Sequence, residues 1–489
     1  MSEAGREPAG LLVVGGGPGG YVAAIRAAQL GLDVTLVDAG ELGGVCLNEG
    51  CIPSKALISA ADLFARAREA EAMGLLFGEA RVDMGRLQAW KQGVVRQLTR
   101  GVRQLLEGNG VRILHGRARL AGPGRVRVEP VAGGDGAALP EGGEIAFRQA
   151  ILATGSRPAA LEALPFDGEW VLDAGGALAL GELPGDLVVV GGGYIGIELG
   201  SVYAKLGSRV TVVEALPEIL SGVGAQLVAV VERRLRRMGV TVHKGARLLG
   251  GEPPHGEARQ GRVVVRLADG SESRLPADRV LVAVGRRPNS EGLGLETVGL
   301  EADRRGFLAV DEQRRTRHPG LFAIGDLAGG LLLAHKASHE GIVAAEAAAG
   351  LRTAFEPRAI PAVIFSDPEI ATAGLDEEEA RRQGAEPLVA RFNFAANGRA
   401  LGEGRGEGFV QLVAEKGDHT LLGVQIVGPD ASSLIGEAVL AIEMGATLED
   451  LALTIHAHPT LPETIMEAAG VGLGRPVHAL PRRRPETAG

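Results

Sequence analysis

The two cysteines of the protein, Cys46 and Cys51, lie five positions apart in the segment GGVCLNEGCIPSK. In a protein without an export signal, a close cysteine pair more often serves redox or metal chemistry than structural cross-linking. A structural zinc site needs four ligands, and the sequence contains no second cysteine pair that could complete one. The spacing alone leaves two interpretations, a redox-active pair or two free thiols on an ordinary helix.

A disulfide between these cysteines requires a helix that is interrupted between them. The Cα atoms of a disulfide lie within about 7 Å of each other, whereas five residues of regular α-helix separate Cα atoms by roughly 8.6 Å. Gly50 permits such an interruption, and Pro53 suits the first turn of a helix that begins just after Cys51. Cys51 would then lie near a helix N-terminus, where the helix dipole favours the thiolate.

The first of two glycine-rich segments, GGGPGG, follows an apolar strand expected at 11–14 and precedes a helix. A second strand ends in an acidic residue about 20 residues later. Glycines at this spacing allow a tight turn and the close approach of a pyrophosphate, and the acid can bind a ribose hydroxyl. The segment predicts a dinucleotide site at Gly15, Gly17, Gly20 and Asp38.

A second segment, LVVVGGGYIGIELG from Leu187 onward, repeats the pattern and predicts a site at Gly191, Gly193, Gly196 and Glu214. Two such sites imply two bound nucleotides, with electrons or hydride passing between them. Glu214 can bind a ribose 2′-hydroxyl and would repel a 2′-phosphate, and no arginine follows it in EALPEIL. The second nucleotide is therefore expected to be NAD rather than NADP.

The cysteine segment closely resembles the redox-active disulfide segment of the FAD-dependent pyridine nucleotide–disulfide oxidoreductases. Its CIPSK ending is similar to the dihydrolipoamide dehydrogenase branch of that family, and the resemblance extends over about residues 11–470. It implies that Cys46 and Cys51 form a disulfide that dihydrolipoamide reduces at Cys46. It further implies that the first nucleotide is FAD, which receives electrons from Cys51, and that the second is NAD.

The resemblance also assigns a catalytic base. In HAHPTLPETIMEA, His458 and Glu463 match the family's base and the carboxylate that orients it. A neutral imidazole can accept a thiol proton near pH 7, and a carboxylate fixes its tautomer. Thr460 and Glu463 also form the T-x-x-E pattern of a capping box, and one carboxylate could serve both roles. His456 is expected to be structural, and Pro462, where the family would have serine, is benign in a first helical turn.

Further cofactor contacts are implied by motifs that match the family. Thr154 and Gly155 lie in ATGSRP, Gly285 begins GRRPN, and Asp326 ends TRHPGLFAIGD, where the family binds the flavin ribityl chain. On the following helix, two histidines are expected to be non-catalytic, His335 and His339.

Lys55 and Glu198 match a family pair beside the flavin, where opposite charges would tune hydride transfer. Without the family match, two unrelated solvated charges would be the simpler interpretation. Tyr194 is expected either to cover the flavin as a gate that NAD displaces or to be a plain core tyrosine.

The composition excludes several classes of function. A net charge of −9 and an aromatic content of 3% argue against a nucleic-acid partner. No apolar run approaches the roughly 20 residues of a membrane span. With two cysteines and no export signal or transit peptide, we expect a cytoplasmic protein without a bound metal.

With 489 residues, the chain is long enough for about three domains. We expect an α/β fold with two doubly wound, Rossmann-like dinucleotide-binding domains and a C-terminal α+β dimerisation domain. The expected limits are 1–155 for the FAD-binding domain, 156–284 for the NAD-binding domain, 285–355 for the return to the FAD-binding domain, 356–475 for the interface domain and 476–489 for a tail. The arginine cluster of the tail is expected to be a solvated extension.

The resemblance implies a homodimer whose partners are lipoyl domains of 2-oxoacid dehydrogenase or glycine cleavage complexes. Three alternatives are less consistent with the residues. A glutathione reductase would prefer arginines where Glu214 lies, and a mercuric reductase would carry an extra C-terminal cysteine pair. A non-enzymatic flavoprotein subunit would not need the intact set of Cys46, Cys51, His458 and Glu463. A lipoamide-dependent NADH assay distinguishes these possibilities.

Overall fold

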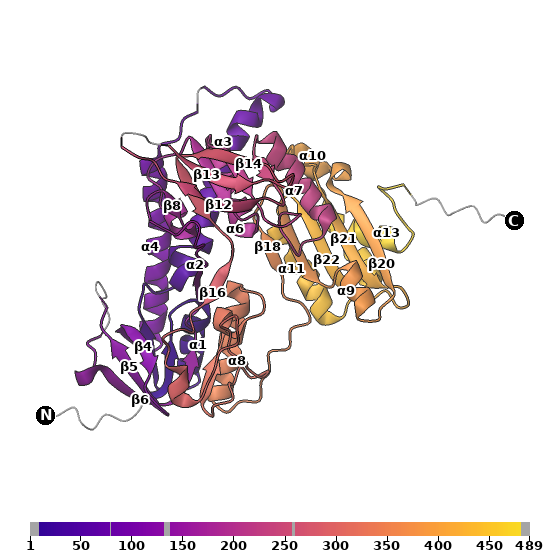
Figure 1. Cartoon of the computed structure of the whole chain (residues 1–489). Coiled ribbons are helices and arrows are strands. Elements are labelled where there is room, and N and C mark those ends of the chain that lie inside the picture. Colours follow the sequence, from indigo (N-terminus) through magenta and orange to yellow (C-terminus); the bar gives the residue numbers. More distant parts are fainter. Residues whose placement is uncertain (1–8, 79, 132–136, 257–259, 481–489) are drawn as a thin grey trace. The chain divides into compact units, whose positions relative to one another are not determined.

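The computed structural model describes residues 9–78, 80–131, 137–256 and 260–480 (Figure 1). The chain divides into two compact units, which we call the first and the second unit. The first unit comprises Met1–Pro184, Gly250–Arg262 and Ala277–Glu356, and the second comprises Gly185–Leu249, Val263–Pro276 and Pro357–Gly489. Each unit contains one of the two glycine-rich segments.

The main sheet of the first unit has the strand order β3-β2-β1-β6-β5-β4, and β17 pairs with β6. Parallel pairing joins β1 to β2 and β6, β2 to β3, and β6 to β17. Leu11, Leu12 and Val13 are fully buried in β1, as expected for a parallel strand covered on both faces. The strands are β1 (Ala9–Val14), β2 (Val34–Asp38), β3 (Arg112–His115), β4 (Arg117–Leu120), β5 (Arg125–Glu129), β6 (Glu144–Leu152) and β17 (Leu321–Ala323).

Two helices of the first unit, α1 (Pro18–Gln29) and α8 (Ala334–Ala348), pack closely because small residues face each other. A Cβ atom on Gly341 would lie 2.5 Å from the carbonyl oxygen of Gly19. The close packing fixes the start of α1 against the rest of the unit. The other α-helices are α2 (Gly44–Asn48), α3 (Cys51–Glu69), α4 (Met84–Gly108) and α5 (Ala174–Leu178).

Two further strand pairings lie within the first unit. β8 (Val171–Leu172) is parallel to β15 (Arg279–Val282), and β7 (Ser156–Pro158) is antiparallel to β16 (Arg286–Pro288). The second pair joins the ATGSRP and VGRRPN motifs, which are far apart in the sequence. A separate three-stranded sheet has the order β12-β13-β14, with β12 (Arg247–Glu252), β13 (Gly261–Arg266) and β14 (Glu272–Ala277).

The second glycine-rich segment lies in a parallel β-α-β arrangement of the second unit. The strand order is β11-β10-β9, with β9 (Asp186–Val190), β10 (Arg209–Val213) and β11 (Thr241–His243). Helix α6 (Tyr194–Leu206) connects β9 to β10, and α7 (Ala225–Arg237) precedes β11. All five residues of β9 are buried, as is usual for a strand of a doubly wound sheet.

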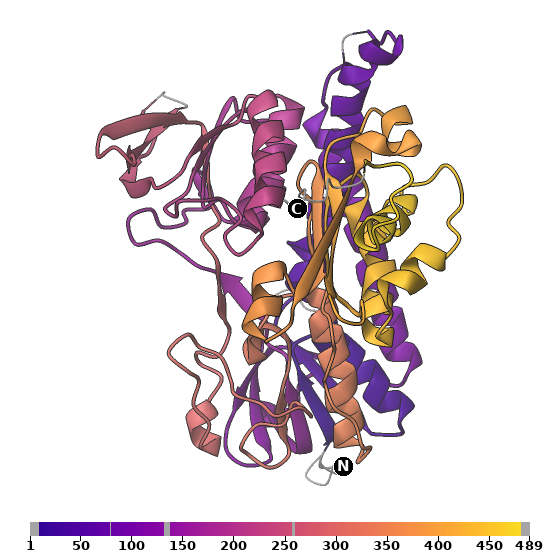
Figure 2. The ribbon, with the colours of Figure 1, turned by 90° about the vertical axis from the view of Figure 1, so that its right-hand side faces the viewer.

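The C-terminal part of the second unit is an antiparallel sheet with helices on one face (Figure 2). The sheet has the order β18-β19-β22-β21-β20, and its inner face forms a core with α11 and α13. The strands are β18 (Ala362–Ile364), β19 (Glu369–Gly374), β20 (Pro387–Asn393), β21 (Phe409–Glu415) and β22 (Leu421–Gly428). The helices are α9 (Glu377–Arg382), α10 (Gly398–Gly402), α11 (Ala431–Met444), α12 (Leu448–Leu453) and α13 (Glu463–Gly472).

The expected fold class is confirmed: doubly wound dinucleotide arrangements precede an α+β domain. The predicted domain limits stay predictions. The arginine cluster of the tail lies outside the described residues. Across the described ranges, no helix combines the length and the apolar character needed to cross a membrane.

Candidate active site

The helix that carries the cysteines is interrupted between them, as predicted. Helix α2 ends at Asn48, and the 19-residue helix α3 begins at Cys51 itself. Gly50, with φ −140° and ψ −109°, lies at the break. A Cβ atom there would lie 3.0 Å from the carbonyl oxygen of Val45, closer than most side chains tolerate. Cys51 therefore occupies the N-terminal end of a long helix.

Cys46 is partly buried, Cys51 is exposed, and both are thiols in this structure. A side-chain hydrogen bond with Cys51 is the main reason that the pKa of Cys46 is raised. Burial raises it further, and the charge of Lys55 opposes the change. The raised pKa favours the thiol form of Cys46, while the N-terminus of α3 favours the thiolate at Cys51. The hydrogen bond between the two side chains suits exchange between dithiol and disulfide.

The first glycine segment has the shape that a dinucleotide pyrophosphate requires. Gly15 has φ +104°, and a Cβ atom on it would lie 2.2 Å from the carbonyl oxygen of Ala153. A Cβ atom on Gly20 would lie 1.8 Å from the Gly15 oxygen, which keeps α1 tight against the turn. Gly17 has open space instead, with no atom within 4 Å of its Cβ position. Open space at the second glycine fits the approach of a pyrophosphate.

Asp38 closes this segment from the end of β2. Its carboxylate accepts hydrogen bonds from the backbone N–H groups of Gly16 and Gly40, the latter at 2.6 Å. Burial raises the pKa of Asp38, although these two donors and nearby His115 oppose the shift. The acid is therefore already oriented beside the turn, where a ribose would lie.

The second glycine segment repeats this geometry. Gly191 has φ +110°, and a Cβ atom on Gly196 would lie 2.0 Å from the Gly191 oxygen, while Gly193 is open. Glu214 accepts hydrogen bonds from the N–H groups of Gly192 at 2.6 Å and Leu216 at 2.7 Å. The same residue types therefore fit a second dinucleotide.

Asp326 lies in a polar cluster that joins the ATGSRP and VGRRPN motifs. Ser156 Oγ donates a hydrogen bond to Asp326 Oδ2, and Arg286 Nε donates to Ser156 Oγ at 2.7 Å. Arg286 Nε also lies 4.0 Å from Asp326 Oδ2. Ser156 and Arg286 are not among the site residues predicted from the sequence. The arginine beside Gly285 is the only sequence signal for this contact.

The turn before Asp326 is fixed by a buried carboxylate on α8. Glu340 is fully buried and accepts a hydrogen bond from the N–H of Gly325 at 2.7 Å. It pairs with Arg314 at 3.0 Å and with Lys336 at 2.8 Å. Two cations compensate the buried charge, which would otherwise be strongly unfavourable.

Thr154 and Asn289 join the same two motifs through paired hydrogen bonds. Thr154 Oγ1 donates to the carbonyl oxygen of Asn289, and Asn289 Nδ2 donates to that of Thr154, both at 2.9 Å. Gly155 accepts from the N–H of Asn289 at 2.9 Å. The predicted contacts Thr154, Gly155, Gly285 and Asp326 therefore belong to one cluster of the first unit.

His458 and Glu463 form the predicted pair. His458 Nδ1 lies 2.9 Å from Glu463 Oε1, and the N–H of Thr460 donates to Glu463 Oε2 at 2.6 Å. Because the carboxylate can only accept, the proton lies on Nδ1 and Nε2 is free to act as a base. The His458 side chain is 80% exposed in the single chain, whereas that of Glu463 is 17% exposed.

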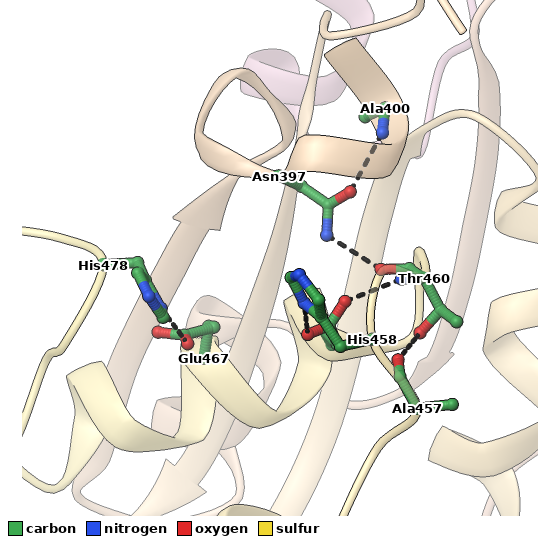
Figure 3. A network of polar contacts seen from close by, with 8 residues as sticks. Asn397, Ala400, Ala457, His458, Thr460, Glu467 and His478 are labelled. Atoms are coloured by element: carbon green, nitrogen blue, oxygen red, sulfur yellow. Dashed lines mark hydrogen bonds and ion pairs between the residues drawn. The ribbon is translucent and has the colours of Figure 1, made fainter. Parts of the chain in front are cut away.

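Asn397 supports this pair from the N-cap position of helix α10 (Figure 3). Its Nδ2 donates to the carbonyl oxygen of Thr460 at 2.9 Å, while its Oδ1 accepts from the N–H of Ala400 at 2.9 Å. Asn397 thus caps α10, an arrangement worth about 1 kcal/mol, and holds the segment that carries His458. It is not among the residues predicted from the sequence.

Only one of the two hydrogen bonds of the predicted capping box at Thr460 is present. Glu463 reaches back to the N–H of Thr460, as the pattern requires. The Thr460 hydroxyl, however, donates to the carbonyl oxygen of Ala457 at 2.7 Å instead of accepting from the helix. Helix α13 begins at Glu463 after Pro462, so the threonine lies too early to cap it.

The remaining predicted residues lie on helices. Lys55 belongs to α3 in the first unit, and Glu198 to α6 in the second, so their pairing stays a prediction. Glu198 is 4% exposed and accepts a hydrogen bond from the N–H of Phe365 at 2.9 Å. Tyr194, the first residue of α6, is 43% exposed, which argues against a core tyrosine. His335 and His339 are exposed on α8.

The site combines two similar nucleotide-binding turns, a thiol pair at the start of a helix and an oriented imidazole. This combination is typical of the flavin-dependent thiol–disulfide oxidoreductases that also use a pyridine nucleotide. No group of side chains suited to a metal ion occurs in the described part of the chain. The chain belongs to the pyridine nucleotide–disulphide oxidoreductase family, whose sequence model matches residues 10–341. The dimerisation domain of the same family matches residues 360–469. Enzymes of this family use FAD and NAD.

Individual relatives are similar over nearly their whole lengths. A dihydrolipoyl dehydrogenase of Geobacillus stearothermophilus is 52% identical over 469 residues, which cover 96% of this chain and 97% of that protein. A dihydrolipoyl dehydrogenase of Halobacterium salinarum is 50% identical over 474 residues, covering 96% and 98%. The crystal structure of LpdA from Mycobacterium tuberculosis matches with a TM-score of 0.85 and 29% identity, covering 94% of this chain and 99% of that one.

Proposed function

We propose that the protein oxidises dihydrolipoamide to lipoamide and reduces NAD to NADH. The observation that carries this proposal is the interrupted helix, which brings the Cys46 thiol within hydrogen-bonding reach of Cys51. The relatives that are about half identical to this chain are dihydrolipoyl dehydrogenases, and they support the choice of substrate.

The side chains suggest how a dithiol is oxidised. His458 Nε2 removes a proton from one thiol of dihydrolipoamide, and Glu463 stabilises the resulting imidazolium. The thiolate attacks the Cys46 sulfur of the Cys46–Cys51 disulfide, forms a mixed disulfide and releases Cys51 as a thiolate. The second substrate thiol then attacks the mixed disulfide, which expels Cys46 and completes the cyclic disulfide of lipoamide. The proton from the second thiol balances the charge on Cys46.

FAD bound in the first unit would supply a two-electron carrier between the Cys46–Cys51 dithiol and NAD. The FAD contacts that we propose are Gly15, Gly17, Gly20, Asp38, Lys55, Thr154, Gly155, Gly285 and Asp326, with Glu198 paired to Lys55 beside the flavin. The proposed NAD contacts are Gly191, Gly193, Gly196 and Glu214. Tyr194, exposed at the start of α6, is proposed to cover the flavin until NAD displaces it.

We further propose a homodimer in which each His458–Glu463 pair completes the site of the other subunit. The match to a family dimerisation domain at 360–469 supports this arrangement. Four apolar residues between 440 and 455 are exposed in the single chain and suit such an interface: Leu440, Met444, Leu453 and Ile455. The proposed location is the cytoplasm, and the proposed partners are lipoyl domains of 2-oxoacid dehydrogenase or glycine cleavage complexes.

The substrate assignment is tested by measuring NAD reduction with dihydrolipoamide and comparing it with glutathione as the thiol and NADP as the acceptor. Efficient turnover is expected only with dihydrolipoamide and NAD. Turnover with glutathione and not with dihydrolipoamide would contradict the proposal, as would a pure flavoprotein without thiol-dependent activity.

The shared site is tested by mixing Cys46→Ser subunits with His458→Gln subunits under conditions that allow subunit exchange. In a mixed dimer, one site carries both lesions and the other carries neither, so activity should recover toward half of the wild-type value. Demonstrated exchange without recovery would mean that each chain completes its own site.

A further inference from the structure

His456 lies two residues before His458 and is less exposed than the residues on either side of it. Its side chain is only 7% exposed. The Nδ1 atom lies 2.9 Å from the carbonyl oxygen of Thr454, and the Nε2 atom lies 2.9 Å from Glu437 Oε1 on α11. Both ring nitrogens are therefore engaged, one within the segment and one with a helix beneath it.

Both partners of this ring are acceptors. A carbonyl oxygen has no proton to donate, and an ionised carboxylate has none either. Two hydrogen bonds from one imidazole to two acceptors require a proton on each nitrogen, which makes His456 an imidazolium paired with Glu437. Such charge-assisted bonds are roughly twice as strong as neutral ones.

The charge of His456 also acts on Glu463. Burial of Glu463 favours its protonated form, but the N–H of Thr460, His458 and, more weakly, His456 together lower its pKa below the usual value. The charged groups arranged around His456 are thus Glu437 on α11 and Glu463 at the start of α13, with His458 bonded to the latter.

We propose that His456 is a positioning residue for proton transfer from the substrate thiol. It ties the segment that carries His458 to α11, and its positive charge lies near the His458–Glu463 pair, where it disfavours the uptake of a further proton by the pair. His456 does not touch the reacting atoms and acts only through Glu463 and His458. This inference rests on the proposed oxidation of dihydrolipoamide.

Two substitutions separate the tether from the charge. His456→Gln removes the charge and shortens the side chain. Glu437→Gln lets a neutral His456 accept a hydrogen bond from the carboxamide, so the tether persists while the pair loses its charge. His419 provides a matched control, because it pairs with Glu449 at 2.7 Å elsewhere in the same unit, and His419→Gln removes a comparable ion pair.

The experiment measures kcat/KM for dihydrolipoamide across pH, together with FAD content and NADH oxidation by an artificial acceptor that bypasses the cysteines. His456→Gln should lower kcat/KM by about tenfold at neutral pH and leave FAD content and acceptor reduction within about twofold. Without the nearby cation the His458–Glu463 pair takes up a proton more readily, so the acid limb of the profile should move upward by about 0.3–0.5 pH unit. Glu437→Gln should move the limb similarly with a smaller loss, and His419→Gln should do neither.

Wild-type rates and an unmoved acid limb in both variants would overturn the role of His456. An unmoved limb with a uniform loss at every pH would also overturn it, since that pattern reports only a loosened segment. An equal loss in His419→Gln would show a general effect of removing an ion pair. If the wild-type protein itself fails to oxidise dihydrolipoamide while reducing the artificial acceptor, the proposed function is wrong instead.

Discussion

The two nucleotide-binding segments share one backbone geometry but differ in what surrounds it. Gly191 and Glu214 are separated by the same number of residues as Gly15 and Asp38. In each segment the acid accepts hydrogen bonds from the N–H of the second residue of the glycine run and from the N–H two positions after itself. The glycine turn and the acid therefore have the same geometry in both segments. The two segments differ in the helices around them.

The helices that follow the two turns are packed differently. Helix α1 begins with Pro18 and contacts α8 through glycines, so that its N-terminal half is enclosed by backbone. Helix α6 begins with the exposed Tyr194, and near its C-terminal end Lys205 pairs with Asp367 at 2.8 Å. Close backbone packing suits a cofactor that stays bound, whereas an exposed aromatic at the helix start suits a nucleotide that exchanges.

The largest expected effect comes from adding a methyl group where the turn meets its helix. Gly20→Ala would place a Cβ 1.8 Å from Gly15 O, and Gly196→Ala would place one 2.0 Å from Gly191 O. Gly20→Ala should abolish FAD binding and all activity. Gly196→Ala should retain FAD and its absorbance but lose NAD-dependent turnover by more than about 100-fold.

Absorbance at the flavin band and steady-state assays measure both outcomes. Gly200→Ala is the control on α6, because its nearest atom would lie at an ordinary 3.5 Å. Loss of FAD from Gly196→Ala would show that the two sites are not independent.

Removing one of the two cysteines should have the next largest effect. Cys51→Ser should bind FAD and reduce an artificial acceptor with NADH, yet lose dihydrolipoamide oxidation by at least about 1000-fold, because no disulfide can form. Cys51 at the start of α3 is the residue expected to remain a thiolate. The long-wavelength thiolate–flavin absorbance of the reduced enzyme should therefore vanish in Cys51→Ser and persist in Cys46→Ser. The opposite pattern would reverse the two cysteine roles.

Sequence patterns predict those parts of the site that depend on neighbouring residues. Both glycine turns, their acids and the break at Gly50 follow from residues within one β-α-β unit or one helix, so their local geometry could be predicted. The pairing of His458 with Glu463 joins residues five positions apart and is equally local.

Contacts between distant segments could not be predicted in this way. Asn397 reaches Thr460 across 63 positions, and Ser156 reaches Asp326 across 170. Neither partner has a local pattern that requires the other. The short helix α12 also escapes prediction, although Thr447 and Asp450 form a capping box, because six residues show too little periodicity and the helix depends on packing against α13.

Substitution of the acid in the second segment tests which nucleotide it selects. Glu214→Arg should lower kcat/KM for NAD and raise it for NADP, and the ratio should change by about 100-fold, because a carboxylate repels a 2′-phosphate and a guanidinium binds it. Replacement also removes the hydrogen bonds to Gly192 and Leu216, so some activity with both nucleotides should be lost. Glu214→Gln serves as the uncharged control and should change the ratio less. Equal use of NAD and NADP by the wild-type enzyme would refute the assignment.

The smallest expected effect concerns the open second glycine of each turn. Gly17 and Gly193 have no atom within 4 Å of the Cβ position, and neither requires a positive φ. Alanine should therefore fit the protein without strain and leave the melting temperature of the NAD-free enzyme within about 1 °C, in contrast to Gly196→Ala. The added methyl occupies the space that a pyrophosphate needs, so Gly193→Ala should raise the KM for NAD by about tenfold with little change in kcat, a loss of uniform binding. The matched Gly17→Ala should weaken FAD retention during dialysis and leave the KM for NAD unchanged. A Gly193→Ala enzyme with wild-type KM would mean that the nucleotide does not approach this turn, and the equivalence of the two segments would then apply to the backbone alone.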